Sequence, residues 1–205
     1  MLKVYTDKIH FSSNVYILTI NNNTIIIDPG YYDNEIKNEL KNINPKAILL
    51  THGHFDHIKA IDEIKNDYPS IEIYIHKDDY KFLTNPKYNL SEEDNPIIIK
   101  APVNVMEEGE YIINNIKINL INTKGHTKGS SLFYLEDENI LFTGDTLFAG
   151  SIGRTDFIDG SITDMQGSIN KIKSLNLKLN TLICPGHGPI STYENELKNN
   201  IYLMQ

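Results

Sequence analysis

Four side chains of the kind that bind metal ions lie within six positions of the stretch THGHFDH: His52, His54, Asp56 and His57. Imidazole and carboxylate groups hold catalytic zinc, iron or manganese when they converge on one point. On an α-helix His52 and His54 would point about 200° apart, so they can share an ion only in an extended or turning segment. The apolar stretch PKAILLT before the cluster predicts a strand that ends there. A loop of solvated histidines is the alternative, but chance rarely produces this spacing.

Three more residues of the same kind follow apolar stretches and lie beside glycine: His126 in KGHTKG, Asp145 in FTGDTL and His187 in PGHGPI. Each is weak evidence alone, because a single His or Asp in a glycine turn is usually structural. If neighbouring strands end at one edge, however, all three meet the cluster. Seven such ligands are too many for one tetrahedral ion and suit two ions that share an aspartate and a hydroxide. We therefore expect two divalent ions, zinc in the first place, with iron and manganese as alternatives.

Apolar periodicity predicts the elements that must position these residues. In the first half we expect strands over 2–6, 14–20, 24–28, 45–51 and 71–76. Helices are expected over 33–43, after the histidine cluster through Ile58, Ile61 and Ile64, and near 77–83.

In the second half the expected strands cover 97–105, 111–123, 131–137, 139–145 and 181–185. Two helices are expected, over 163–176 and at the end of the chain, with candidate capping boxes at Thr163 with Gln166 and at Ser191 with Glu194. Two β-rich halves with helices on their outer faces indicate a four-layer α/β sandwich (αββα), with residues 1–205 forming one domain. Two ordinary α/β layers are the alternative.

Composition restricts the partners. The formal net charge is −8 and the isoelectric point about 5.3, which argues against a nucleic-acid or anionic-membrane surface. We expect no leader peptide and no membrane span, since no apolar run approaches 18 residues. The single cysteine, Cys184, excludes an internal disulfide, favours the cytoplasm and is expected to be a buried hydrophobe. His10 and His76 lack ligand-like surroundings and are interpreted as surface or core residues.

Four motifs, THGHFDH, GHTKGS, FTGDTLFAGSIGRTDF and PGHGPIST, resemble in order and spacing the metallo-β-lactamase-fold hydrolases. The similarity runs from about Val15 to Ser191 and is strongest to the short glyoxalase II-like (hydroxyacylglutathione hydrolase-like) proteins. It implies an αββα sandwich with two ions in one site. The implied ligands are His52, His54 and His126 for the first ion, Asp56, His57 and His187 for the second, and Asp145 as the bridge.

The resemblance also implies the reaction, hydrolysis of an acyl-thioester such as S-lactoylglutathione by a metal-bridging hydroxide, with Asp56 and Asp145 as catalytic carboxylates. Asp28 would orient the histidine loop through a hydrogen bond, or it is a simple turn residue before Pro29. Arg154 in GRTD would anchor a substrate carboxylate or pair with Asp156 or Asp159.

Other interpretations remain at this point. Full-length glyoxalase II carries a C-terminal helical domain that grips the thiol, whereas 18 residues follow His187 here, so the thiol carrier is open. A rival enzyme is a persulfide dioxygenase with a single iron on His52, His126 and Asp145. A non-catalytic metal-binding scaffold is a third reading. The expected partner is a small-molecule acyl-thiol, and the expected assembly is a monomer or homodimer.

Overall fold

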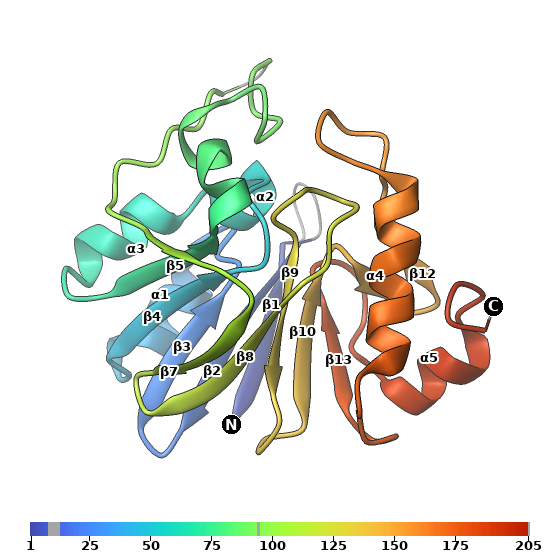
Figure 1. Cartoon of the computed structure of the whole chain (residues 1–205). Helices are drawn as coiled ribbons and strands as arrows, with labels where there is room; N and C mark the ends of the chain where they lie inside the picture. Colours follow the sequence, from blue (N-terminus) through green and yellow to red (C-terminus); the bar gives the residue numbers. More distant parts are fainter. Residues whose placement is uncertain (8–12, 94, 205) are drawn as a thin grey trace.

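Two six-stranded sheets lie face to face in the computed structural model, which describes residues 1–7, 13–93 and 95–204 (Figure 1). The first sheet has the order β1-β2-β3-β4-β5-β6. Its strands are β1 (Leu2–Thr6), β2 (Asn14–Ile20), β3 (Asn23–Ile27), β4 (Pro45–Leu50), β5 (Glu72–His76) and β6 (Asn104–Met106).

The second sheet has the order β14-β13-β10-β9-β8-β7. Its strands are β7 (Gly109–Ile113), β8 (Ile116–Asn122), β9 (Ser131–Leu135), β10 (Ile140–Gly144), β13 (Leu182–Pro185) and β14 (Ser191–Thr192). A small hairpin of β11 (Leu147–Phe148) and β12 (Ser151–Ile152) follows β10.

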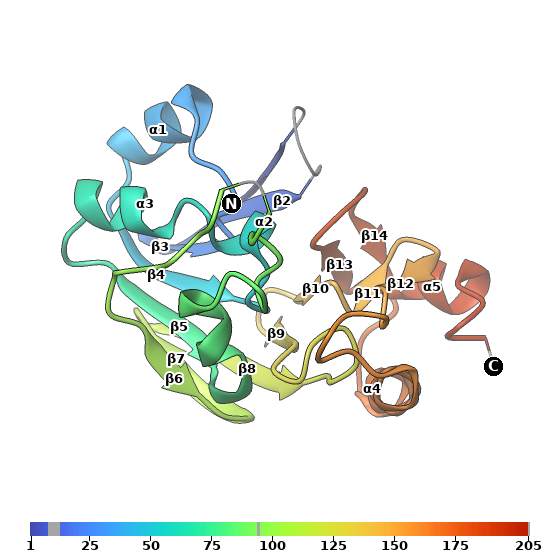
Figure 2. The same cartoon turned by 90° about the horizontal axis from the view of Figure 1, so that it is seen from above.

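Helices cover the outer face of each sheet. The first sheet carries α1 (Asn34–Lys41), α2 (Phe55–Ile58), α3 (Ile61–Asp67) and the 3₁₀ helix η1 (Lys77–Thr84), and the second carries α4 (Ile162–Ser174) and α5 (Tyr193–Asn199). Seen from above, α1 and α3 lie on one flank of the molecule and α4 and α5 on the opposite flank (Figure 2). The four-layer sandwich predicted from the sequence is confirmed.

Side-chain alternation along the strands builds three apolar layers. On β3, Ile25 and Ile27 face the opposite sheet while Ile26 faces the helices of the first half. On β13, Cys184 lies fully buried between the sheets, as expected, and Ile183 packs against α4 and α5. Both faces of these strands are buried, so successive residues are hydrophobic and the strands form continuous apolar runs in the sequence.

Strand direction places the candidate ligands at one edge. β4 runs parallel to β3 and β5, and β13 runs parallel to β10. β8 has the same direction as β10, because both are antiparallel to β9 between them. The loops that follow β8, β10 and β13 consequently leave the second sheet from one edge. The loop after β4 meets them there, since His54 Nδ1 lies 2.9 Å from His126 Nε2.

Four predicted elements differ from the structure. The helix after the histidine cluster is split into α2 and α3, since the backbone N–H of Ala60 donates to Pro29 O at 3.0 Å instead of continuing one helix. The stretch 111–123 is a hairpin, because Asn114 and Asn115 adopt φ values of 51° and 60° that suit a tight turn. Of 97–105 only β6 pairs with β5, and the backbone of Ala101 donates to the Asp62 carboxylate instead. The helix near 77–83 is the 3₁₀ helix η1.

Both capping boxes are misplaced by one or two residues. Helix α4 is capped by Ser161, whose hydroxyl accepts from the N–H of Asp164 at 3.2 Å, and not by Thr163. Helix α5 is capped by Thr192 and not by Ser191, whose hydroxyl donates to Glu196. At α4 the extended backbone makes Ser161 the cap, while Thr163 already lies inside the helix. At α5 both Ser191 and Thr192 belong to β14, and Thr192 is the cap because its hydroxyl accepts from the N–H of Asn195 at 3.2 Å. Over the described ranges, no helix has the length and apolarity to cross a membrane.

Candidate metal centre

The seven predicted ligand residues all lie at the edge where the four strands end. Six of them form two groups whose ligand atoms lie within 4.8 Å of one another, and Asp28 forms a third such group with His52 and His57. We call His52, His54 and His126 the first trio, and Asp56, His57 and His187 the second trio. Residues 72 positions apart, His54 and His126, are brought together from the two sheets.

The first trio is a dry cluster of imidazoles. His54 Nδ1 lies 2.9 Å from His126 Nε2. The exposed fractions of His52, His54 and His126 are 1%, 4% and 3%. His52 Nε2 is buried and has no hydrogen-bond partner among the described residues. A buried acceptor without a partner lowers the stability of the folded protein unless a cation or a proton binds to it.

The second trio mixes imidazole with carboxylate and reaches the solvent. His187 Nε2 lies 3.2 Å from Asp56 Oδ2 and 3.3 Å from His57 Nε2. The side chain of His57 is fully buried, whereas that of His187 is 27% exposed. Water and small molecules can therefore reach this side of the site.

Asp145 lies between the trios and contacts both. Its Oδ1 is 3.5 Å from His57 Nε2 in the second trio. Its Oδ2 is 3.5 Å from His126 Nε2 in the first trio and 3.5 Å from His187 Nε2 in the second. Oδ1 is buried without a hydrogen-bond partner in the described part of the chain. A carboxylate in this position has the reach that a bridge between two ions needs.

Groups behind the imidazoles hold them in one orientation. His126 Nδ1 donates to the backbone O of Arg154 at 2.8 Å, and His57 Nδ1 donates to Asp28 Oδ2 at 3.2 Å. Asp28 also accepts from the hydroxyl of Thr51, which in turn lies 3.1 Å from His52 Nδ1. With Nδ1 occupied in this way, the rings of His52, His57 and His126 turn Nε2 toward the centre, whereas His54 faces His126 with its Nδ1.

Asp28 fits both interpretations made from the sequence. It orients His57 through the hydrogen bond just described, and it accepts from the backbone N–H of Thr51 at 2.7 Å. It also has φ of 51°, the left-handed conformation typical of turn residues.

The trios differ in charge. Burial lowers the pKa values of His52, His54 and His126, so the first trio consists of neutral imidazoles. Burial opposes protonation of His57 too, but the carboxylates of Asp56 and Asp145 hold its pKa well above the usual range. In the second trio, the nearby carboxylates therefore favour the protonated, positively charged form of His57.

This donor set fits divalent ions. Each trio offers three nitrogen or oxygen ligand atoms, and both trios share Asp145. His52 Nε2 and Asp145 Oδ1 have no hydrogen-bond partner in the described part of the chain, so their lone pairs are available to an ion. No thiol takes part, which leaves zinc, iron and manganese as matching ions. The residues present thus form a His/Asp cluster able to bind metal.

Arg154 is an exposed side chain at the rim. Its guanidinium makes two hydrogen bonds to the Asp156 carboxylate, at 2.8 and 3.0 Å, which is one of the pairings expected from the sequence. It also lies 4.7 Å above the ring of Phe157, and this ring stands 5.0 Å from that of His54. Contact of Arg154 with a substrate stays a prediction.

Sequence reasoning missed several neighbours of the trios. Phe82 and Phe157 stand beside the ring of His54, and Asp79 is a buried carboxylate next to two ligand loops. The stretch KDDYKFL gave no local sign of this, because its acidic residues resemble those of any exposed helix start. His76 caps η1 with its Nδ1, as a structural residue would, and His10 lies outside the described residues.

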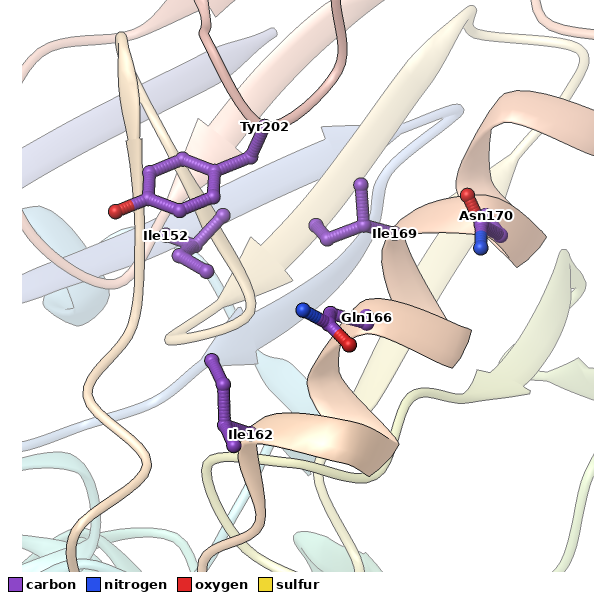
Figure 3. Close-up of a pocket in the computed structure, with 6 residues that line it drawn as sticks. All are labelled: Ile152, Ile162, Gln166, Ile169, Asn170 and Tyr202. Carbon is purple, nitrogen blue, oxygen red and sulfur yellow. The ribbon is translucent and has the colours of Figure 1, made fainter. Parts of the chain in front are cut away.

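A separate cavity of about 450 Å³ lies on the outer side of the second sheet (Figure 3). It is lined by residues from β12, α4 and the C-terminal segment: Ile152, Ile162, Gln166, Ile169, Asn170 and Tyr202. These side chains include no imidazole, carboxylate or thiol. The cavity therefore does not belong to the metal centre.

Comparisons with known proteins agree with this geometry. The family model described as metallo-beta-lactamase superfamily matches residues 10–187. The probable metallo-hydrolase YqgX of Bacillus subtilis is 36% identical over 196 residues, 93% of this chain and 92% of that protein. The hydroxyacylglutathione hydrolase GloC of Haemophilus influenzae is 32% identical over 187 residues, 88% of this chain and 87% of that protein.

Solved structures have the same fold. The B3 metallo-beta-lactamase BLEG-1 has a TM-score of 0.92 at 34% identity, with 100% of both chains covered. TTHA1623 in a di-iron-bound form has a TM-score of 0.87 at 27% identity, with 98% of this chain and 100% of that chain covered.

Proposed function

The chain belongs to the metallo-β-lactamase superfamily of metallo-hydrolases, and we propose that it hydrolyses acyl-thioesters in the manner of glyoxalase II. The observation that carries the proposal is the pair of trios, both complete, with Asp145 between them. A mononuclear iron site on His52, His126 and Asp145 would leave the second trio without a role. The 32% identity to GloC adds support for a thioester over other acyl groups.

Each residue has a defined task in this proposal. The two trios and Asp145 hold two divalent ions, and zinc is our first choice. Iron should be tested as well, because the similar protein TTHA1623 has a di-iron-bound form. Bound there, the ions would polarise a carbonyl and lower the pKa of water to near 7. The side chains of Asp56 and His187 are partly exposed to solvent, so water would enter the site from their side. A thiolate leaves readily, because its thiol has a pKa near 8.5, and no separate acid is required.

Arg154 would serve the substrate and not the ions. Its guanidinium is a planar fork that matches a carboxylate, such as those of a small peptide thiol. It stands on Phe157, which itself faces His54 and His126. A substrate carboxylate bound at Arg154 would have to replace Asp156 as its partner.

The test is a panel of acyl-thioesters with one acyl group and different thiols: glutathione, another small thiol and coenzyme A. The metal-loaded protein is assayed with each ester for release of the thiol. In a separate assay with glutathione persulfide, an oxygen electrode measures oxygen uptake. We expect thiol release from at least one ester and no oxygen uptake. Robust oxygen uptake without thioester cleavage would establish the dioxygenase instead, and a fully loaded protein with neither activity would favour a scaffold.

A β-lactam is the second candidate substrate, because BLEG-1 is 34% identical over the full length of both chains. The amine that leaves from a β-lactam needs a proton, whereas a thiolate does not. A penicillin and a cephalosporin therefore belong in the same panel. Turnover of a β-lactam that exceeds that of every thioester would reverse our choice.

A further inference from the structure

Asp79, on the 3₁₀ helix η1, is a fully buried carboxylate outside the seven ligand residues. Its Oδ2 accepts from the backbone N–H of Gly53 at 3.0 Å and from the hydroxyl of Thr127 at 2.7 Å. Its Oδ1 accepts from the backbone N–H of Gly129 at 2.7 Å. Burying a carboxylate is unfavourable unless its hydrogen bonds compensate, so this arrangement calls for an explanation.

All three donors lie in the loops that carry the first trio. Gly53 separates His52 from His54 in the loop after β4 of the first sheet, and Thr127 follows His126 in the loop after β8 of the second. The hydrogen bonds join residues 26, 48 and 50 positions away from Asp79. One side chain thus connects the two sheets where the first trio meets.

Two glycines of the motifs permit this close approach. A Cβ on Gly129 would lie 2.5 Å from Asp79 Oδ1, and a Cβ on Gly53 would lie 2.3 Å from the Cβ of Phe82 in the same helix η1. Both contacts are shorter than real Cβ atoms show. The glycines in THGHFDH and GHTKGS therefore allow η1 to pack directly on the ligand loops.

We propose that Asp79 is a positioning residue for the first metal ion, because it fixes the His52–His54 loop against the His126 loop. The second trio has a different buried carboxylate behind it, Asp28 on His57. Asp79 should therefore control affinity at the first trio and not at the second. The inference rests on metal binding by the trios, which is part of the proposed function, but not on the identity of the thioester.

The test measures affinity at one trio at a time. In a His187→Ala background we expect cobalt(II) to bind the first trio, and in a His126→Ala background the second. Asp79→Asn keeps the volume but replaces one acceptor oxygen with a donor. We expect cobalt(II) affinity, read from its absorption spectrum during competition with a chelator, to fall about 10- to 100-fold at the first trio and to stay within about twofold at the second.

Glu196→Gln is the matched control. Glu196 is also fully buried and accepts from a backbone N–H, that of Gly150, at 2.7 Å, but it joins α5 to the β11–β12 hairpin. Both variants should lose stability, and only Asp79→Asn should lose affinity at the first trio. Equal affinity losses in both variants, or an unchanged first-trio affinity in Asp79→Asn, would overturn the positioning role.

Thr127→Val decides the question if Asp79→Asn does not fold. It removes the hydroxyl that donates to Asp79 and also lies 2.7 Å from Ser130 Oγ, and it leaves the two backbone hydrogen bonds from Gly53 and Gly129. We expect a smaller affinity loss at the first trio and the same unchanged second trio; no loss at the first trio would contradict the proposal. If the unmodified protein binds no metal ion, both the role of Asp79 and the proposed function are wrong. If it binds two ions with the expected affinities but has no thioesterase activity, only the proposed function is wrong.

Discussion

The two trios occupy one edge of the same sandwich, yet they differ in solvent contact and in charge. The first consists of three buried imidazoles with lowered pKa values. The second contains the carboxylate of Asp56, a partly exposed His187 and a His57 whose pKa is raised. Position along the edge explains the difference: His187 comes from β13, beside the short edge strand β14, and His126 is enclosed by Phe157 and the loop after β4.

The difference indicates a division of labour. The first trio supplies only neutral donors besides the shared Asp145, whereas the second adds the carboxylate of Asp56, which would offset more of the charge of an ion there. A buried aspartate also lies behind each trio: Asp79 holds the loops of the first, and Asp28 bonds His57 of the second directly while it reaches His52 only through Thr51. Asp145 is the residue that both trios share, so its removal should have the largest effect.

Asp145→Ala removes the carboxylate that reaches both trios. We expect turnover to fall by more than about 100-fold, beyond the 10- to 100-fold that partners behind the ligands usually control. Metal content should fall at both trios, as measured by elemental analysis after dialysis. Wild-type turnover with full metal content would contradict the shared role.

His126→Ala and His187→Ala each remove one member of one trio. We expect about one ion per chain to remain in each variant, held by the intact trio, where the wild type holds two. Elemental analysis and cobalt(II) titration give the number directly. The comparison between the trios fails if either variant keeps two ions or loses both.

Asp79 provides a test of stability against pH that involves no ligand residue. Burial raises its pKa to about 6, compared with about 3.9 in an unfolded chain. The folded state therefore keeps this proton over a range in which the unfolded state has lost it, and rising pH weakens the folded state by up to about 3 kcal/mol between pH 4 and 7.

Asp79→Asn has no such proton to lose. As pH rises from 4 to 7, the free energy of unfolding of the metal-free wild type should decline relative to that of the variant by this amount. Urea unfolding of both proteins at several pH values measures it. A difference that does not change with pH would show that Asp79 is ionised throughout.

Asp28→Asn is the corresponding change behind the second trio. Asparagine tolerates the left-handed backbone of this position, φ 51°, but its amide keeps only one acceptor oxygen. It therefore cannot accept from the backbone N–H of Thr51 on one side and from His57 on the other, as the two carboxylate oxygens do. We expect affinity at the second trio to fall about 10- to 100-fold, measured by cobalt(II) titration in the His126→Ala background.

The control for Asp28→Asn is Asp33→Asn at the N-cap of α1, where the side chain accepts from two backbone N–H groups far from the trios. Asparagine is an equally good cap, so neither stability nor metal affinity should change. An unchanged affinity in Asp28→Asn as well would leave Asp28 as a turn residue only.

The sequence predicted that these seven side chains would lie together because the signals are local: a dense cluster at residues 52–57, and three strands that end in His or Asp beside glycine. Their division between two ions came from the family resemblance and stays a prediction. Asp79 was not predictable, because its partners lie 26 to 50 residues away and no local pattern marks it. The predictions of the helix caps were wrong although the signal is local. Ser161 and Thr163 are equivalent by residue type, and only the backbone conformation distinguishes them.

Arg154→Ala should produce the smallest effect and distinguish the substrate from the ions. The backbone O of Arg154 keeps its hydrogen bond to His126, so metal content and kcat should not change. If the guanidinium binds a substrate carboxylate, KM should rise about twofold to fivefold, the size expected of one exposed ionic contact. Arg154→Lys should recover only part of this rise, because the ammonium lacks the planar fork.

Asp156→Asn provides the opposite change at the same place. It weakens the pair that occupies the guanidinium, so a substrate carboxylate that competes with Asp156 should bind more tightly and KM should fall. Steady-state kinetics with the best thioester, and with an analogue that lacks the carboxylate, measure both variants. If KM moves in the same direction in the two variants, or moves equally for the analogue, then Arg154 only stabilises its loop and the substrate is recognised elsewhere.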